Sequence, residues 1–537
     1  MKKNHFILQR QKITPGSLFF LISLFLVIFV RLRLLSMPLD RDEGGWAYAG
    51  WLLLNGNPPF TYFYDTKMPG IYYIYAFIMM IFGQTTTGIR TGVLLTVLIN
   101  MFLVYKVFTK ISGDSDDRKL LCSAFYGLLT LDRGTLSLSG YSTHFILTFV
   151  MLSLIFLFDA LKNGKKIMFF MSGLFMGLAF LTKQPAIFFV LFFLIYIIII
   201  DLINHVRVKD ILIKVVLYFT GATSIFLFVC LIMKINGVFD RYWFMTVIYA
   251  FKHGNVISIS QIHGYINYFL KVTSVFFKIT FVLYVLWLFL IVFFIKEQDK
   301  KIFHIILFLS SAAFCASGFY FTQHYFIIFA LPASLAFSED FNFKSGKAGL
   351  ILDKIKYTIF VFLLILLIIT QFDVLFQLSP SKVSRKIFLA NPFPESEEVA
   401  KFIKNNTKET DKIAIFGSEP QILFHARRIS ATGYVYFNQL MEENEISRKM
   451  QQEAIKEIED AKPEYMVFSN IDTSWMIRPN SSKQILDWIK YKVQKDYDLV
   501  GLVLLEKKYE TKYLWQEKID KRRLNEPFLL AVFKKVK

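Results

Sequence analysis

Charged residues are scarce in this 537-residue sequence. They make up only 19% of it, whereas 55% of the residues are hydrophobic and the mean hydropathy is +0.47. A typical soluble domain carries roughly 25% charged residues. The apolar excess falls in long runs, such as 17–30, 187–200 and 357–370, which approach the ~20 residues needed to cross a bilayer. This composition excludes a soluble enzyme, a disordered chain and a β-barrel.

Cysteine is also scarce. The three cysteines, Cys122, Cys230 and Cys315, lie in apolar runs without CxxC spacing or a partner at metal-ligand distance. No disulfide framework or zinc site is therefore expected. We assign no cofactor and no metal ligand, and a divalent cation stays an open alternative. The net charge of +20 does not indicate that the protein binds nucleic acid, because the Lys and Arg residues cluster between apolar runs.

Windows of about 19 residues predict membrane spans along the first two-thirds of the chain. The eleven spans cover residues 17–36, 88–109, 119–138, 144–161, 167–182, 184–203, 211–233, 274–295, 302–320, 325–338 and 355–375. The first follows a basic segment, 1–12, and no small-residue cleavage site follows it. We therefore expect a retained span with a cytoplasmic amino terminus.

Basic residues alternate between the two sides of the predicted membrane. The loops that would be cytoplasmic contain Lys106, Lys110, Arg118 and Lys119, then Lys162, Lys165 and Lys166, then Arg207 and Lys209, then Lys296, Lys300 and Lys301, then Lys344, Lys347, Lys354 and Lys356. The opposite loops are poor in Lys and Arg, as the positive-inside rule requires. An odd number of spans places the carboxyl terminus outside. We expect a multi-pass protein of the plasma (inner) membrane.

Two outer segments, 38–87 and 236–273, are too long for simple turns. The first contains two apolar stretches, 43–54 and 68–82, that are too short to span and are typical of helices lying in the membrane interface.

Beyond the last span the sequence becomes rich in Glu and Lys. Short β-rich runs at 412–416, 465–468, 499–505 and 528–533 alternate with helical stretches at 395–405, 442–461 and 482–495. This alternation is typical of an α/β domain. The predicted fold is thus a polytopic α-helical membrane domain, 1–379, followed by an extracytoplasmic α/β domain, 380–537.

Three carboxylates fall within a stretch of four residues just after the first span. Asp40, Asp42 and Glu43 lie where ionised groups are costly, so they are usually functional or paired. They could instead be solvated, or cap the helix that begins there. Further along, Lys67 precedes Pro69 and a predicted helix. Its ammonium and the free N–H groups of that helix could bind a phosphate, although a lysine at a membrane surface also snorkels.

These residues carry a resemblance to the GT-C membrane glycosyltransferases, in the branch of the protein O-mannosyltransferases and bacterial aminoarabinose transferases. The shared elements are the Asp42-Glu43 pair, a Lys-Pro-Pro-like element at Lys67-Met68-Pro69, Gly83, Arg90, Lys183, His324-Tyr325, Pro332 and the α/β tail. The resemblance covers nearly the whole chain. It departs from relatives at Thr143, where they often carry a second acidic residue.

The resemblance implies transfer of a sugar, with inversion, from a polyprenyl-phosphate donor to an acceptor on the outer face. Asp42 would be the general base, with Glu43 beside it, because an attacking hydroxyl must lose its proton. Lys67 would neutralise the leaving phosphate, with Arg41 as a second candidate.

Further contacts follow from the same resemblance. Three basic residues would bind the donor phosphate, namely Lys183, Lys252 and Arg241. Five others would line the substrate site, namely Tyr48, Thr143, His144, His324 and Tyr325. The basic residues could equally be headgroup contacts of helix ends and surface helices, and His144 could be structural.

Two other classes of function remain open. One is a transporter or flippase, although neither internal repeats nor many mid-span charges are visible. The other is a polymerase or ligase of the O-antigen type, acting on polyprenyl-linked glycans. For the glycosyltransferase, the expected partners are a polyprenyl-phosphate sugar, a lipid, protein or glycan acceptor, and membrane lipids, without nucleic acid. Neither the sugar nor the acceptor is set by the sequence.

Overall fold

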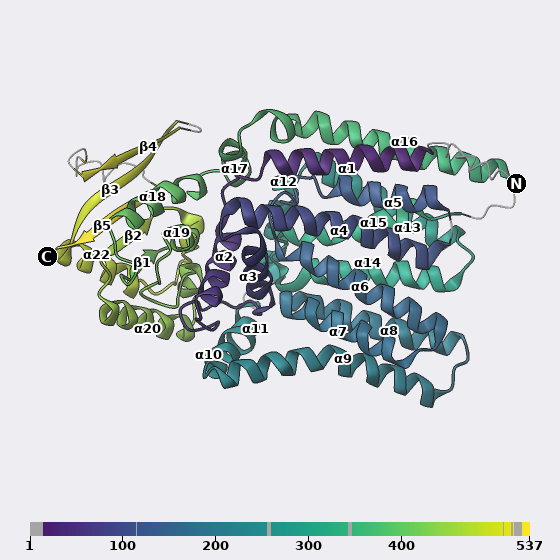
Figure 1. Ribbon diagram of the computed structural model, residues 1–537, viewed down its shortest axis with the longest axis horizontal. Helices are drawn as coiled ribbons and strands as arrows, with labels where there is room; N and C mark the ends of the chain where they lie inside the picture. Colours follow the sequence, from purple (N-terminus) through teal and green to yellow (C-terminus); the bar gives the residue numbers. More distant parts are fainter. Residues whose placement is uncertain are drawn as a thin grey trace, which may run out of the picture.

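Long apolar helices run side by side in a bundle, and a small α/β unit covers one end of it (Figure 1). The computed structural model describes residues 14–113, 115–254, 259–341, 346–507, 510–516, 519 and 529–536. The predicted basic segment 1–12, Lys344 and Phe528, the expected start of the last strand, lie outside the described residues. We call the end of the bundle that meets the α/β unit the capped end.

Among the described residues, eleven helices form the bundle. They are α1 (Pro15–Arg33), α4 (Thr86–Ser112), α5 (Asp116–Leu129), α6 (Ser142–Asn163), α7 (Lys166–Thr182), α8 (Ile187–Ile203), α9 (Val208–Ile235), α13 (Val275–Phe294), α14 (Gln298–Ala316), α15 (Ala330–Ser338) and α16 (Gly346–Phe372). Within the described residues, eight helical segments are long and apolar enough to cross a membrane. The polytopic helical architecture is confirmed, and the count of eleven crossings stays a prediction.

One predicted span is wrong in its length. The sequence predicts a span over 119–138, but α5 ends at Leu129. The chain then turns, because the Asp132 carboxylate accepts the backbone N–H groups of Gly134 and Thr135 at 3.1 and 3.0 Å. Asp132 also accepts the Ser274 hydroxyl at 2.6 Å. The described ion pairs do not include one between Asp132 and the next residue, Arg133. A side chain that binds its own backbone competes with the helix and ends it.

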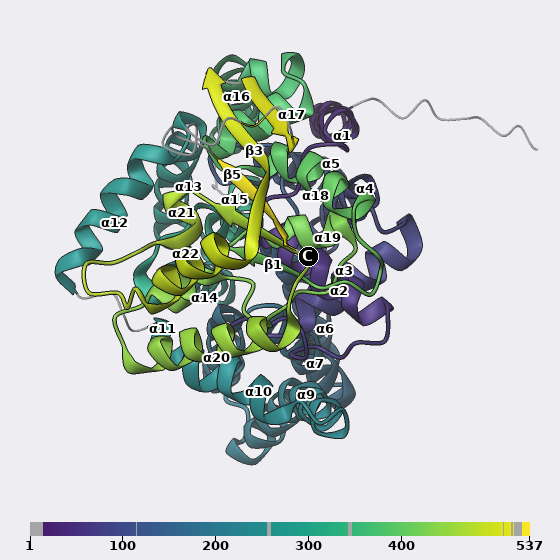
Figure 2. The ribbon, with the colours of Figure 1, turned by 90° about the vertical axis from the view of Figure 1, so that its left-hand side faces the viewer.

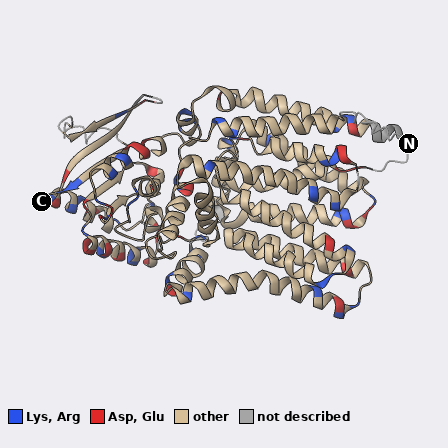
Figure 3. Cartoon of the chain, in the orientation of Figure 1, with Lys and Arg blue, Asp and Glu red and all other residues tan. Residues whose placement is uncertain are grey.

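The middle of the bundle is almost free of charged residues, as Figure 3 shows. Lys, Arg, Asp and Glu gather at its two ends and in the α/β unit. Large apolar side chains such as Phe25, Phe102 and Ile369 are 64%, 58% and 72% exposed on the helix surfaces. An exposed apolar surface of this extent suits contact with lipid.

Two shorter helices, α2 (Arg41–Leu54) and α3 (Gly70–Phe82), lie between the bundle and the α/β unit (Figure 1). Their existence and approximate bounds confirm the prediction for the first outer segment. The structure differs in one respect, since Trp46 and Tyr48 of α2 are completely buried. The α/β unit covers one face of this helix (Figure 2), where the Tyr48 hydroxyl accepts the backbone N–H of Ser430, whereas Trp46 packs against Tyr75 and Tyr141.

Short helices occupy the second long segment and the turns near the capped end. They are α10 (Phe239–Trp243), η2 (Phe244–Tyr249), α11 (Ala250–Gly254), α12 (Ile259–Val272), η1 (Gln184–Ala186), η3 (Ser317–Phe319), η4 (Gln323–Phe329) and η5 (Asp373–Gln377).

The α/β unit follows a linking helix, α17 (Pro380–Phe388). Its helices are α18 (Phe393–Asn405), α19 (Gln421–Ala426), η6 (Phe437–Met441), α20 (Glu445–Ala461), α21 (Asp472–Trp475) and α22 (Gln484–Asp496). Its strands are β1 (Ile413–Phe416), β2 (Tyr465–Ser469), β3 (Tyr497–Lys507), β4 (Glu510–Trp515) and β5 (Leu530–Lys535). The α/β prediction is confirmed, with β4 as a strand that the sequence pattern missed.

The sheet has the order β1-β2-β5-β3-β4. Only β1 and β2 are parallel, with Ile413 opposite Tyr465 and Phe416 opposite Phe468. The other neighbours pair antiparallel. The carboxyl ends of β1 and β2 therefore meet at one edge, where α/β proteins usually hold their ligands.

The charge pattern predicts which end of the bundle faces the cytoplasm. In a variant lacking Cys230, a cysteine placed at exposed Gln494 of the α/β unit should react with a membrane-impermeant maleimide in intact cells. A cysteine at exposed Lys165 should react only after permeabilisation, because basic loops stay inside. The reverse labelling pattern would place the α/β unit in the cytoplasm.

Candidate active site

The first turn of α2 is fixed by its own carboxylates. Asp40 precedes the helix and its Oδ1 accepts the backbone N–H of Glu43 at 2.9 Å. Glu43 Oε2 accepts the backbone N–H of Asp40 at 3.3 Å. This reciprocal capping box explains why an acidic residue stands at both positions. The helix-capping alternative is thus confirmed for two of the three carboxylates.

Glu43 is also anchored to the bundle. Its two oxygens accept Arg90 Nη1 at 2.6 Å and Nη2 at 2.7 Å, and Oε1 accepts the backbone N–H of Gly140. Arg90 further donates to the carbonyls of Met37 and Pro38 at 3.3 and 3.2 Å. Glu43 and Arg90 are 0% and 4% exposed. Every oxygen of Glu43 is engaged, so its contacts are structural.

Asp42 turns away from this anchor. Its side chain is 25% exposed, and its Oδ1 lies 3.4 Å from Lys67 Nζ. Burial favours the neutral acid, but the charges of Lys67 and Lys183 outweigh it and lower the pKa of the Asp42 carboxyl. Burial and the charges of Glu43 and Asp42 raise the pKa of Asp40 to about 8. Of the three carboxylates, only Asp42 is both ionised and accessible.

Lys67 lies between two carboxylates and two aromatic rings. Its Nζ is 3.4 Å from each oxygen of Asp65, in addition to Asp42. The ammonium lies 4.9 Å from the ring centre of Tyr436 and 6.0 Å from that of Trp46. Burial opposes the charge, but the two carboxylates outweigh it and raise the pKa of Lys67.

Asp65 is a site residue that the sequence reading missed. It is fully buried and accepts the Tyr72 hydroxyl at 3.2 Å and Gln439 Nε2 at 3.4 Å. In the sequence, the feature that could have indicated a role for Asp65 was its position two residues before Lys67. Gln439 and Tyr436 come from the α/β unit, more than 300 residues away, and nothing in the sequence pattern pointed to them.

A second lysine completes the cluster. Lys183, in the turn between α7 and α8, has its Nζ 3.1 Å from His324 Nε2 and 4.0 Å from the ring centre of Tyr325. The His324 ring stacks on Tyr141 at 4.1 Å. Thr143 donates to the backbone carbonyl of His324 at 2.9 Å. Four of the predicted residues therefore meet at one place.

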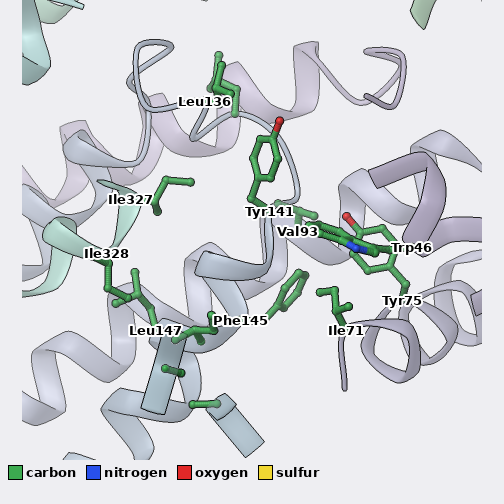
Figure 4. Close-up of a cluster of buried hydrophobic side chains, with 14 of the residues drawn as sticks. Trp46, Ile71, Tyr75, Val93, Leu136, Tyr141, Phe145, Leu147, Ile327 and Ile328 are labelled. Atoms are coloured by element: carbon green, nitrogen blue, oxygen red, sulfur yellow. The ribbon is translucent and has the colours of Figure 1, made fainter. Parts of the chain in front are cut away.

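Aromatic side chains pack beneath the charged groups. Trp46 meets Tyr75 and Tyr141 edge-on, with ring centres 5.6 and 6.3 Å apart, and Tyr75 meets Phe145 at 6.2 Å. Figure 4 shows these rings converging from α2, α3 and α6. Such rigid packing fixes the groups above it.

Three predicted residues contact the α/β unit instead of the cluster. Arg41 donates to the carbonyl of Thr473 at 2.9 Å and pairs with Glu419 at 2.9 Å. Arg241 pairs with Glu453, and the Tyr48 hydroxyl accepts the backbone N–H of Ser430 at 2.9 Å.

Two further predicted residues also lie apart from the cluster. His144 is fully buried, with Nε2 2.9 Å from the carbonyl of Ser137. Lys252 is exposed and lines a separate polar cavity of about 450 Å³ with Arg478. Among the described residues, no group of three or more His, Cys, Asp or Glu side chains could hold a metal ion.

An apolar cavity of about 730 Å³ lies among the helices of the bundle. Side chains of α3, α4, α6, α7 and α9 line it, including Phe77, Phe149 and Phe228. Its lining also includes Gly70 and Thr182, which lie three residues and one residue from the two lysines of the cluster. The lining of the cavity is thus almost wholly apolar, and two of its residues are close in sequence to the lysines of the cluster.

Comparisons with known proteins agree with this arrangement. Residues 66–233 match the family model described as dolichyl-phosphate-mannose-protein mannosyltransferase. Two solved structures of ArnT from Cupriavidus metallidurans are similar over nearly the whole chain. The form bound to undecaprenyl phosphate has a TM-score of 0.55 at 12% identity and covers 97% of this chain and 98% of that chain. The apo form has a TM-score of 0.53 at 11% identity, with 96% and 97% covered.

The chain has the GT-C fold. A further GT-C structure, the archaeal oligosaccharyltransferase AglB from Archaeoglobus fulgidus in complex with an inhibitory peptide and a dolichol-phosphate, has a TM-score of 0.51 at 10% identity. It covers 94% of this chain and 75% of that chain. No curated protein sequence matches. The predicted resemblance to the GT-C membrane glycosyltransferases is confirmed.

The geometry predicts different roles for the adjacent carboxylates. Glu43→Gln should lower the free energy of unfolding by roughly 3–5 kcal/mol, because it leaves the buried Arg90 charge uncompensated. Asp42→Asn should change it by less than about 1 kcal/mol, because its lysine partner keeps a second carboxylate. Thermal unfolding in detergent compares the two variants. Equal destabilisation would contradict this division.

Proposed function

We propose that this GT-C protein transfers a sugar from a polyprenyl-phosphate donor to an acceptor on the outer face of the membrane. The proposal is carried by two features: the cluster of Asp42, Lys67 and Lys183, and the apolar cavity of about 730 Å³ in the bundle. The cavity lining includes Gly70 and Thr182, which are close in sequence to the two lysines. An isoprenoid chain is apolar throughout and ends in a phosphate. Only such an amphipathic ligand satisfies both parts of this site at once.

The two lysines suit the phosphate. An anion near Lys67 and Lys183 would exchange their present contacts with Asp42 and His324 for charge-assisted hydrogen bonds. As the bond between sugar and phosphate breaks, negative charge grows on the leaving oxygen. Fixed cations beside that oxygen lower the barrier without reorganising. Lysine acts here as a point charge, which suits a phosphate whose orientation changes during the reaction.

Asp42 suits the general base. Once the phosphate binds Lys67, the Asp42 carboxylate loses part of the charge that lowers its pKa and becomes a better proton acceptor. Its exposed side chain can then take the proton of the attacking hydroxyl as that oxygen approaches the anomeric carbon. A single carboxylate opposite the leaving phosphate suits one displacement, with inversion.

The first test measures turnover by purified protein in lipid nanodiscs with a panel of polyprenyl-phosphate sugars. Asp42→Asn should lose ~10²-fold or more in kcat, and Lys67→Ala roughly 10²-fold. Asp487→Asn, which removes an exposed carboxylate of α22, should keep wild-type activity. Full activity of Asp42→Asn would reject the assigned base and favour a polymerase or ligase acting on the same lipid.

Donor binding should depend on pH through Lys183. This lysine lies in the turn between α7 and α8, outside both helices. Burial lowers the pKa of Lys183 to about 7, so its ammonium is neutralised as the pH rises through 7. The sugar-phosphate diester keeps its charge over this range. Donor affinity should therefore fall between pH 6 and pH 8, approaching tenfold per pH unit above the pKa.

Two substitutions separate the lysines in this experiment. Lys183→Arg, whose side chain stays charged, should bind the donor with a flat pH profile. Lys67→Arg should keep the wild-type slope, because the pKa of Lys67 is already raised. Titration of the donor by isothermal calorimetry at pH 6, 7 and 8 provides the comparison. A slope that persists in Lys183→Arg would assign the titration to another group.

A further inference from the structure

The α/β unit contacts the start of α2 mainly through the side chain of Arg41. Arg41 extends into the edge of the sheet where β1 and β2 end, which is the usual ligand position in α/β proteins. Its guanidinium donates to the carbonyls of Ser418 and Thr473, to Asn391 Oδ1 at 3.2 Å and to Glu419 Oε1 at 2.9 Å. Every contact of this charged group comes from the unit that caps the bundle.

Glu419 is built to receive that charge. It follows β1, and its side chain is fully buried. Ser474 and Ser469 donate to its Oε1 at 2.7 and 3.4 Å, and Gln421 donates to its Oε2 at 2.6 Å. A carboxylate without solvent contact and with fixed donors on both oxygens holds a single geometry.

Next to Arg41, α2 carries two glycines that allow the α/β unit to approach its backbone closely. A Cβ at Gly44 would lie 2.4 Å from Gln421 Cβ, and a Cβ at Gly45 would lie 1.9 Å from the Tyr436 hydroxyl. Each glycine inside a helix costs roughly 1 kcal/mol relative to alanine. The glycine pair therefore lets α19 and Tyr436 contact the backbone of α2 directly.

Asp42 follows Arg41 in the first turn of α2. Its carboxylate must stay within reach of both Lys67 and the acceptor, and a misplacement of about 1 Å at a reacting group can cost 10²-fold in rate. Tyr436, which covers Lys67, also donates its hydroxyl to the carbonyl of Arg41 at 3.4 Å. The α/β unit thus contacts Arg41, which precedes the candidate base, Gly44, two residues after it, and Lys67, which faces it.

We propose that Glu419 is a positioning residue, which fixes Asp42 through Arg41 and so makes the α/β unit part of the catalytic machinery. The catalytic half of this proposal rests on the proposed sugar transfer. The mechanical half, that Glu419 holds the first turn of α2, stands on the contacts alone. The two halves are measured separately.

The test compares Glu419→Gln with Glu339→Gln. Glu339 is equally buried but pairs with His304 near the opposite end of the bundle, so it controls for loss of a buried carboxylate. In hydrogen–deuterium exchange, peptides covering 40–54 should exchange faster in Glu419→Gln and unchanged in Glu339→Gln. If Glu419→Gln does not fold, Arg41→Lys replaces it, because lysine keeps the charge but loses the fork of donors.

The kinetic readout separates positioning from general stability. Glu419→Gln should lower kcat about tenfold or more and leave the donor dissociation constant within about twofold of wild type. On an Asp42→Asn background it should cause no further loss, because the two residues act through one step. Additive losses, or unchanged exchange in 40–54, would overturn the proposal. Faster exchange in 40–54 together with no sugar turnover by the wild-type protein would support the role of Glu419 in holding the first turn of α2 and would reject the proposed sugar transfer.

Discussion

The buried ion pair between Glu43 and Arg90 is the constraint on which the rest of the capped end depends. Both side chains are buried, so each charge requires the other and the backbone groups around the pair. The pair joins α2 to α4 and to the turn before α6, which fixes where the first turn of α2 can lie. With one carboxylate committed in this way, the preceding residue, Asp42, must face the opposite side, toward Lys67. Adjacent acidic residues thereby serve different purposes.

The capped end places three kinds of environment within a few residues of one another. Apolar side chains of five helices line a cavity inside the bundle, two largely buried lysines belong to the charged cluster, and polar groups of the α/β unit cover that cluster. Low polarity beneath the lysines strengthens their attraction for an anion. The aromatic rings around Trp46 separate the apolar interior of the bundle from the charged cluster, because they fill space that water would otherwise enter.

Much of the fold could be predicted, because hydrophobic runs and charged loops determine membrane helices almost locally. The spans near α1, α6 and α9 begin and end close to their predicted limits. The span at α5 was predicted too long, because the turn at Asp132 ends the helix. The site was harder to predict. Lys67 was identified from its place before Pro69 and a predicted helix, and Lys183 and His324 through the resemblance. Tyr436 and Gln439 were missed. Their contribution depends on how a distant unit docks, and no periodicity in one sequence encodes that.

The contact between Arg41 and Glu419 also has a consequence for the order in which the protein is made. The two residues are 378 positions apart, so at roughly 5–20 residues per second the ribosome completes Glu419 some 20 to 80 s after Arg41. Throughout that interval α2 lacks its cover, and its glycine pair and Arg41 have no partner. The site therefore matures only when synthesis nears its end. If the protein transfers sugars as proposed, a nascent or prematurely terminated chain would occupy the membrane without consuming its donor.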